Sequence, residues 1–229
     1  MTWWRELIAA GAVPAAFVPP PNTAAARDGE LEDQRADLVE DAELQTHALP
    51  DRSEARIPGA VSFLAGIERW SVVAYDGVVQ IVNAYVAAAI RRRDERGGLH
   101  TTRERTRAFA VAPVERMQSS LRQRLERAAP DLEPIDAELV EQPARYLERV
   151  ESTVRRARTA LERDLAESWI RAARADEWLV LDGLLSRSPA VARHPCSLGV
   201  IKSHGAQFLE GRGLERALTL PAGQRTSVF

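Results

Sequence analysis

Apolar residues recur at two spacings along this chain, and each spacing predicts a different kind of element. Short apolar runs rich in β-branched and aromatic residues predict strands over 60–64, 70–75 and 78–86. The dipeptide Asp76-Gly77 separates the last two runs, and Asp-Gly between β-branched runs is a strong hairpin signal. We therefore expect three consecutive strands, of which the last two are antiparallel.

The second spacing is helical and begins after Gly97-Gly98. The alanine-rich end of the third run, which leads into arginines 91–93, predicts that this strand continues into a helix. A long helix is expected over 144–173, where one apolar stripe comprises Val150, Val154, Ala157, Leu161, Leu165 and Trp169. Short apolar strands are expected at 178–181 and from Leu198 onward. Together these elements predict an α/β fold with a mixed sheet and a helical insertion.

The N-terminal quarter of the chain has a different character. A short amphipathic helix is expected over 2–12, followed by a proline-rich break and an acidic segment over 28–43. Trp3 and Trp4 either pack back on the folded domain or dock on a partner. We expect residues 1–56 to be an extension that contributes little to the core, and residues 57–229 to be one folded domain that is truncated at its C-terminal end.

Composition narrows the class of protein. The balance of 31 basic against 33 acidic residues excludes a globally basic nucleic-acid binder, although not a local basic surface. The single Cys196 excludes a disulfide framework and a cysteine-based zinc site. No apolar run reaches the roughly 20 residues of a membrane span, and the N-terminus lacks the cationic start of a signal peptide. These features predict a cytoplasmic protein with no membrane partner.

Candidate chemistry lies at the ends of the last two expected strands. Asp182 follows one of them, while Lys202 and His204 lie on the same side of the other. Ligand and catalytic groups of α/β sheets gather at such strand ends, and carboxylates are the ligands that Mg²⁺ and Mn²⁺ prefer. On the long helix, Glu162 and Asp164 flank the apolar stripe, so either could join the site. The alternatives are a plain Asp-Gly turn, a polar strand end and a solvated helix face.

Arginines are concentrated in three segments around the helical insertion, 91–96, 103–107 and 122–127. Such clustering is typical of a surface that follows a phosphate backbone. The acidic residues between the arginines leave ordinary helix solvation as the alternative.

Four segments in this order resemble the NurA family of nucleases. They are residues 63–69 (FLAGIER), 178–183 (WLVLDG), 199–204 (GVIKSH) and 223–226 (GQRT). The resemblance covers roughly 57–229. It implies an RNase H-like fold, a homodimer, Mn²⁺ or Mg²⁺ as cofactor, and DNA and a HerA-type hexameric ATPase as partners. The implied function is DNA end processing or antiviral defence.

The resemblance carries site roles to particular residues. It implies that Asp182 and Glu162, or Asp164 in place of Glu162, bind the metal ion, and that Lys202 lies near the phosphate. By strand spacing, Lys202 and His204 together could contact a phosphate or orient a water molecule. Ala65 stands where the family pattern has an aspartate, which implies that this chain is inactive, whether by engineering or by nature. Two functions are therefore expected alternatives: a metal-dependent DNA nuclease subunit, and a non-catalytic adaptor of the same fold that binds a hexameric translocase.

Overall fold

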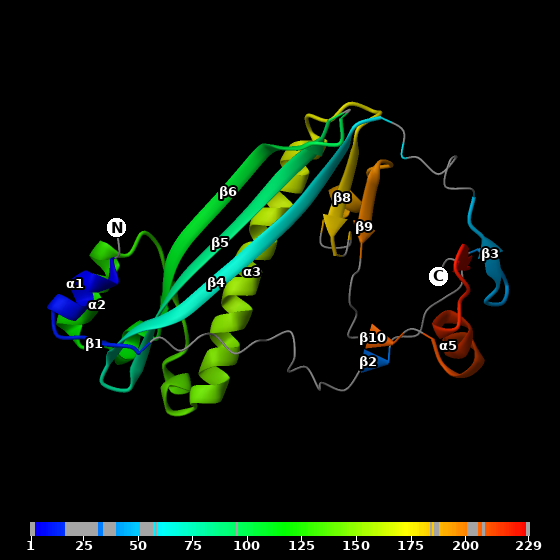
Figure 1. Ribbon diagram of the computed structural model, residues 1–229. Helices are drawn as coiled ribbons and strands as arrows, with labels where there is room; N and C mark the ends of the chain where they lie inside the picture. Colours follow the sequence, from blue (N-terminus) through cyan, green and yellow to red (C-terminus); the bar gives the residue numbers. More distant parts are fainter. Residues whose placement is uncertain are drawn as a thin grey trace. The chain divides into compact units, whose positions relative to one another are not determined.

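The computed structural model describes residues 3–16, 32–33, 40–50, 57, 59–94, 96–183, 185, 188–200, 206–207 and 209–227 (Figure 1). The chain forms two compact units. Unit 1 comprises Met1–Ala25 and Ala60–Val200, and unit 2 comprises Ala26–Gly59 and Ile201–Phe229. This division differs from a split at residue 57, because each unit takes segments from both sides of that position.

Unit 1 is built on a seven-stranded mixed sheet. Its main path has the order β7-β6-β5-β4-β8-β9, and β1 pairs with β4 beside that path. Neighbouring strands among β4, β5 and β6 are antiparallel, whereas β8 is parallel to β4 and β9 is parallel to β8. The strands are β1 (Val13–Pro14), β4 (Val61–Asp76), β5 (Val79–Arg93), β6 (Leu99–Ala112), β7 (Leu132–Pro134), β8 (Trp178–Asp182) and β9 (Ser197–Val200). The expected α/β fold with a mixed sheet is confirmed.

The three long strands differ in extent from the prediction. The hairpin at Asp76-Gly77 is confirmed, with Gly77 at φ +58°, a conformation that glycine adopts without steric cost. The runs 60–64 and 70–75 belong to one strand, β4, which continues without interruption through the expected break at 65–69. Its register with β5 shifts only between Val72 and Ala74. The predicted helix after the alanines is wrong, because β5 stays extended to Arg93 and pairs with β6. The helical insertion therefore begins after Ala112, as η1 (Val114–Arg116), α2 (Ser119–Ala128) and η2 (Ala137–Glu141).

The long helix α3 (Pro143–Ile170) is confirmed, and it runs along one face of the sheet (Figure 1). Its buried side chains, which include Val150, Val154 and Leu165, follow the stripe read from the sequence. They pack on Val86 and Ile90, which are fully buried. The apolar stripe of this amphipathic helix packs along the sheet, so two of the three buried clusters lie on this side of the sheet.

Helices α1 (Trp4–Ala9) and α2 cover the opposite face of the sheet at one end only. Leu7 is fully buried there with Ile81 and Leu125, and the Trp3 indole N–H donates a hydrogen bond to Asn83 Oδ1 at 3.1 Å. Trp3 and its neighbours therefore pack on the domain rather than standing apart as a surface for a partner. The expectation that the N-terminal helix contributes little to the core is wrong, since Trp3 and Leu7 belong to a buried cluster. The expectation was based on the charge pattern, which does not show this burial.

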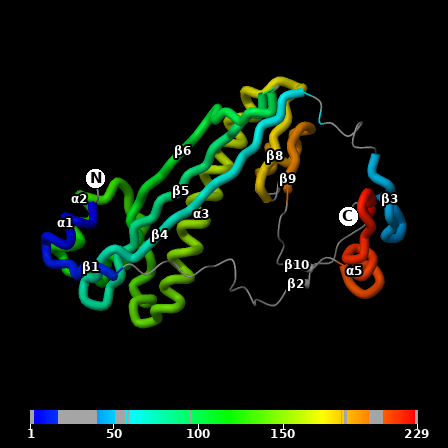
Figure 2. The backbone as a smooth tube through the Cα atoms, in the orientation of Figure 1, coloured from blue at the N-terminus to red at the C-terminus, as the bar shows by residue number. Residues whose placement is uncertain are grey.

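Unit 2 joins segments that are far apart in the sequence. Strand β2 (Glu32–Asp33) pairs in parallel with β10 (Ala206–Gln207), and β3 (Thr46–Ala48) pairs antiparallel with β11 (Gln224–Thr226). Figure 2 shows β3, in blue, beside the red C-terminal end of the chain. The described part of the unit also includes α5 (Gly211–Leu218). Across the described residues of both units, no helix is long and apolar enough to span a membrane.

Candidate functional site

Asp182 lies at the carboxyl end of β8, as the sequence predicts. The parallel register between β4 and β8 ends with the pair Leu64 and Leu181, so Ala65 and Asp182 are the next residues of neighbouring strands. Gly183 follows at φ +118° and turns the chain away from the sheet. The Asp-Gly dipeptide is therefore a turn, and it also delivers an exposed carboxylate to the strand end.

Side-chain alternation separates Ala65 from the helix. Leu64 is buried beneath α3, and Ala65 is exposed on the other face of the sheet. The structure therefore places position 65 beside Asp182 along the sheet, but on the face opposite to Glu162.

Glu162 points from α3 toward the sheet and is only 8 % exposed. Its carboxylate accepts a hydrogen bond from Arg158 Nη1 at 2.8 Å, and Arg158 Nε donates to Glu68 Oε2 at 3.0 Å. A Cβ atom on Gly66 would lie 2.5 Å from Glu162 Oε1, so a glycine is required for this close approach. Of the two helix carboxylates left open by the sequence, Asp164 is exposed and contacts Arg163 instead.

Three charged groups on this face of β4 form one ion-pair network, in which a single arginine is shared by two carboxylates. Arg158 contacts both Glu68 and Glu162, and their side chains are 25 % and 10 % exposed. Burial lowers the pKa of Arg158, but the two carboxylates outweigh that effect and raise its pKa above the usual value. The sequence reasoning missed this triad, although the spacing of Arg158 and Glu162, which is i and i+4, was a visible signal.

Glu162 and Asp182 line the same small cavity. It has a volume of about 30 Å³, and its apolar walls include Leu64, Ala166 and Leu181. A space of this size holds about one ion or water molecule. The structure thus brings together the two residues predicted as metal ligands, at the end of β8 and on the facing turn of α3. Lys202 and His204 lie outside the described residues.

A second polar cluster lies within unit 2, where the sequence reasoning found no ligand set. Glu40, Asp41 and His47 form the one group of three candidate metal ligands among the described residues. Each is already engaged: Asp41 accepts hydrogen bonds from His47 and Ser227, and Glu40 is paired with Arg225. These contacts connect the segment of β3 with the segment of β11. We call the five residues Glu40, Asp41, His47, Arg225 and Ser227 the clasp.

The clasp gives a testable pH effect. The hydrogen bonds from Ser227 and His47 lower the pKa of Asp41, so they favour the folded state above the pKa of an unfolded aspartate and lose this effect as the pH falls. Ser227→Ala should raise the pKa of Asp41 toward its usual value, which carboxyl NMR titration would measure. Ser120→Ala, on the exposed surface of α2, is the matched control. An unchanged Asp41 pKa in Ser227→Ala would contradict the assignment.

Comparison with known proteins adds no identification. The chain matches no protein-family model, and no curated protein sequence matches it.

Proposed function

We propose that this chain is a DNA nuclease subunit of the NurA type, built on an RNase H-like fold and inactive through Ala65. The observation that carries the proposal is the cavity that Glu162 and Asp182 both line, one from a helix and the other from a strand end. The strand arrangement supports it: three long antiparallel strands are followed, after a long helix, by two strands parallel to the first.

The donor atoms fit Mn²⁺ or Mg²⁺ in kind. Carboxylate oxygens are the preferred ligands of these ions, and the cavity has room for one of them. Such an ion would polarise a phosphate oxygen or activate a water molecule when bound. Asp182 and Glu162 would hold it, but two carboxylates are the minimum for such a centre, and Ala65 offers no third.

The missing carboxylate at position 65 is central to the proposal. Asp182 connects position 65 with the cavity. It neighbours position 65 along the sheet, and it also lines the cavity together with Glu162. An aspartate at position 65 would place a second carboxylate beside Asp182, and a metal ion would relieve the repulsion between them. The proposed partners of the active form are DNA, a second copy of the chain and a HerA-type hexameric ATPase.

The adaptor function is the second candidate, and one observation favours it. Arg158 already neutralises Glu162, so this carboxylate has a cationic partner without a metal ion. In that case the fold would serve only to bind a hexameric translocase.

Cleavage by a restored protein separates the two functions. Ala65→Asp should tighten Mn²⁺ binding by at least about 10- to 100-fold, by analogy with the effect of tuning a metal site, and should restore Mn²⁺-dependent DNA cleavage. Calorimetry and a gel assay with the hexameric ATPase present would measure the two effects. Adding Asp182→Ala should abolish both.

Ala89→Asp is the matched control. Ala89 pairs directly with Ala65 on β5, so its carboxylate would lie one strand further from Asp182 and should leave Mn²⁺ binding unchanged. If Ala65→Asp with Mn²⁺ and the ATPase cuts no DNA, the nuclease proposal fails and the adaptor function replaces it.

A further inference from the structure

Among the described residues of unit 1, nothing covers much of the face of β4 and β5 that points away from α3. Helices α1 and α2 cover it as far as Asn83, and beyond that residue no described element of unit 1 packs on it. Ile67 is 58 % exposed there and Tyr85 is 38 % exposed, whereas Val86, on the α3 side, is fully buried. We call this surface the open face; its side chains are those of Phe63, Ala65, Ile67, Arg69, Tyr85, Ala87, Ala89, Arg91 and Arg93.

The open face carries more positive than negative charge among the described residues. None of its three arginines, Arg69, Arg91 and Arg93, forms an ion pair with a described residue. On the α3 side of the same sheet, by contrast, Arg92 pairs with Glu177 at 3.1 Å and Arg107 pairs with Asp131 and Glu133. Two acidic residues accompany the open face: Glu104 on β6, the partner of Ala89, and Asp182 at the end of β8, next to Ala65. The excess of arginines over acidic residues on this face favours a polyanionic ligand.

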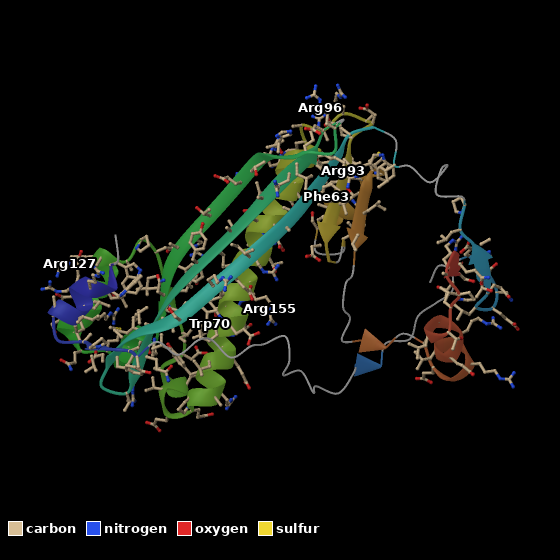
Figure 3. The ribbon with its side chains drawn as sticks, in the orientation of Figure 1. Phe63, Trp70, Arg93, Arg96, Arg127 and Arg155 are labelled. Atoms are coloured by element: carbon tan, nitrogen blue, oxygen red, sulfur yellow. The ribbon has the colours of Figure 1, made fainter. Side chains whose placement is uncertain are left out.

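Aromatic rings accompany these arginines at both ends of the face. Tyr85 lies directly opposite Arg69, and Phe63 lies directly opposite Arg91. The Arg93 guanidinium is 5.3 Å from the centroid of the Phe63 ring (Figure 3). These two aromatic–arginine pairs are separated by about 20 Å along the strands.

Between the two pairs the side chains are mostly small. The intervening cross-strand pairs are Ile67 with Ala87 and Ala65 with Ala89. Alanine leaves room for a ligand to approach the sheet closely. At the Tyr85 end, a hollow of about 390 Å³ adjoins the face and is also lined by Trp3 and Trp4. The surface thus offers aromatic rings on which bases can stack and arginines that can bind phosphates. The small side chains between them leave a shallow region that a ligand can approach closely.

We propose that the open face binds single-stranded nucleic acid, with bases stacked on Tyr85 and Phe63 and phosphates held by the three arginines. Stacking of bases on exposed aromatic rings beside a cationic track is the usual chemistry of single-strand binding. A duplex fits less well, because its bases already stack on one another. The choice of DNA rests on the proposed function, since a strand on this face would pass Ala65 and the neighbouring Asp182.

A second copy of the chain is a poorer occupant of the open face. Packing two such faces together would bury three arginines from each copy, with Glu104 and Asp182 of each copy as the neighbouring acidic residues. Unpaired charges of this kind are costly to bury. The charge pattern therefore favours an anionic strand over self-association.

Fluorescence anisotropy with a labelled oligothymidylate tests the proposal. The full chain is titrated in EDTA, so that neither metal binding nor cleavage contributes. Three phosphate contacts predict that the logarithm of the affinity falls with the logarithm of salt concentration with a slope of about −2. The combined variant Arg69→Gln, Arg91→Gln, Arg93→Gln should bring this slope close to zero. Tyr85→Leu should weaken binding by roughly 5- to 100-fold, and Phe63→Leu by a similar factor.

Arg105→Gln is the matched control. Arg105 is exposed on β6 but pairs with Ala88, so it lies on the α3 side, and its loss should leave the affinity unchanged. No binding at low salt would overturn the proposal, as would equal binding of a blunt duplex together with no effect of Tyr85→Leu or Phe63→Leu. If the triple arginine variant changes the sedimentation of the protein but not its DNA affinity, the face is a protein interface instead. The Ala65→Asp cleavage assay is separate, so either proposal can fail without the other.

Discussion

Leu7→Ala should lower the free energy of unfolding by about 2–5 kcal/mol, the usual cost of truncating a fully buried leucine. Leu7 has no exposed surface and packs with Ile81 and Leu125 beneath the sheet. Helix α1 has only 6 residues, too few for a stable isolated helix, so its burial is what keeps it folded. The loss should therefore include the contacts of Trp3, and urea unfolding followed by tryptophan fluorescence would measure it.

Val13→Ala is the matched control for this prediction. Val13 follows α1 in the short strand β1 and is 59 % exposed, so the same kind of truncation should change stability by less than about 0.5 kcal/mol. If the two variants unfold alike, α1 is not part of the core, and the expectation of a dispensable extension would return.

Arg158→Met should cost about 2–3 kcal/mol of folding free energy, somewhat less than a fully buried pair because the side chains are partly exposed. The change leaves Glu68 and Glu162 facing each other without their shared cation. Denaturant unfolding would measure the loss.

Replacing the whole triad provides the control. Glu68→Leu and Glu162→Leu, combined with Arg158→Met, should recover most of the lost stability, because apolar replacements of similar volume often match a buried ion pair. If Arg158→Met alone is neutral, the contacts in the triad contribute little, and Glu162 would be free of its cation at no cost. That result would remove the observation that favours the adaptor function.

The sequence predicted the elements whose signals are local. The Asp76-Gly77 turn, the helix α3 and the strand β8 were each predicted from spacing or composition within a few residues, and the structure confirms them. Helix α1 was predicted as an element too, but its burial depends on Ile81 and Leu125, which lie far along the chain. Local patterns give the type of an element and not what it packs against.

The strand β6 shows why the rest could not be predicted. Its residues 99–108 are largely exposed and polar, so they carry no apolar alternation. Alanines 87–89 of β5 have a low strand propensity when taken alone. Pairing of the two strands along residues 82–93 overrides both preferences, and that pairing depends on partners outside any local window.

The sequence predicted two residues of the candidate site but not the contacts between them and their surroundings. The position of Asp182 followed from the rule that strand ends carry functional groups, and Glu162 was one of two helix carboxylates considered. The sequence could not show that Arg158 joins Glu162 to Glu68, or that Gly66 leaves space for the Glu162 carboxylate. Those contacts depend on the distance between α3 and β4. That distance cannot be derived from the spacing of residues within either segment.

The two-segment construction of unit 2 has a consequence for synthesis on the ribosome. Residues 26–59 emerge early, but their partners in 201–229 follow only after the intervening part of unit 1, about 140 residues or roughly 7 to 30 s of translation. During that interval β3 exposes an unpaired edge that could join another nascent chain. The like charges of the acidic residues in 28–43 should oppose such association until β11 has been made.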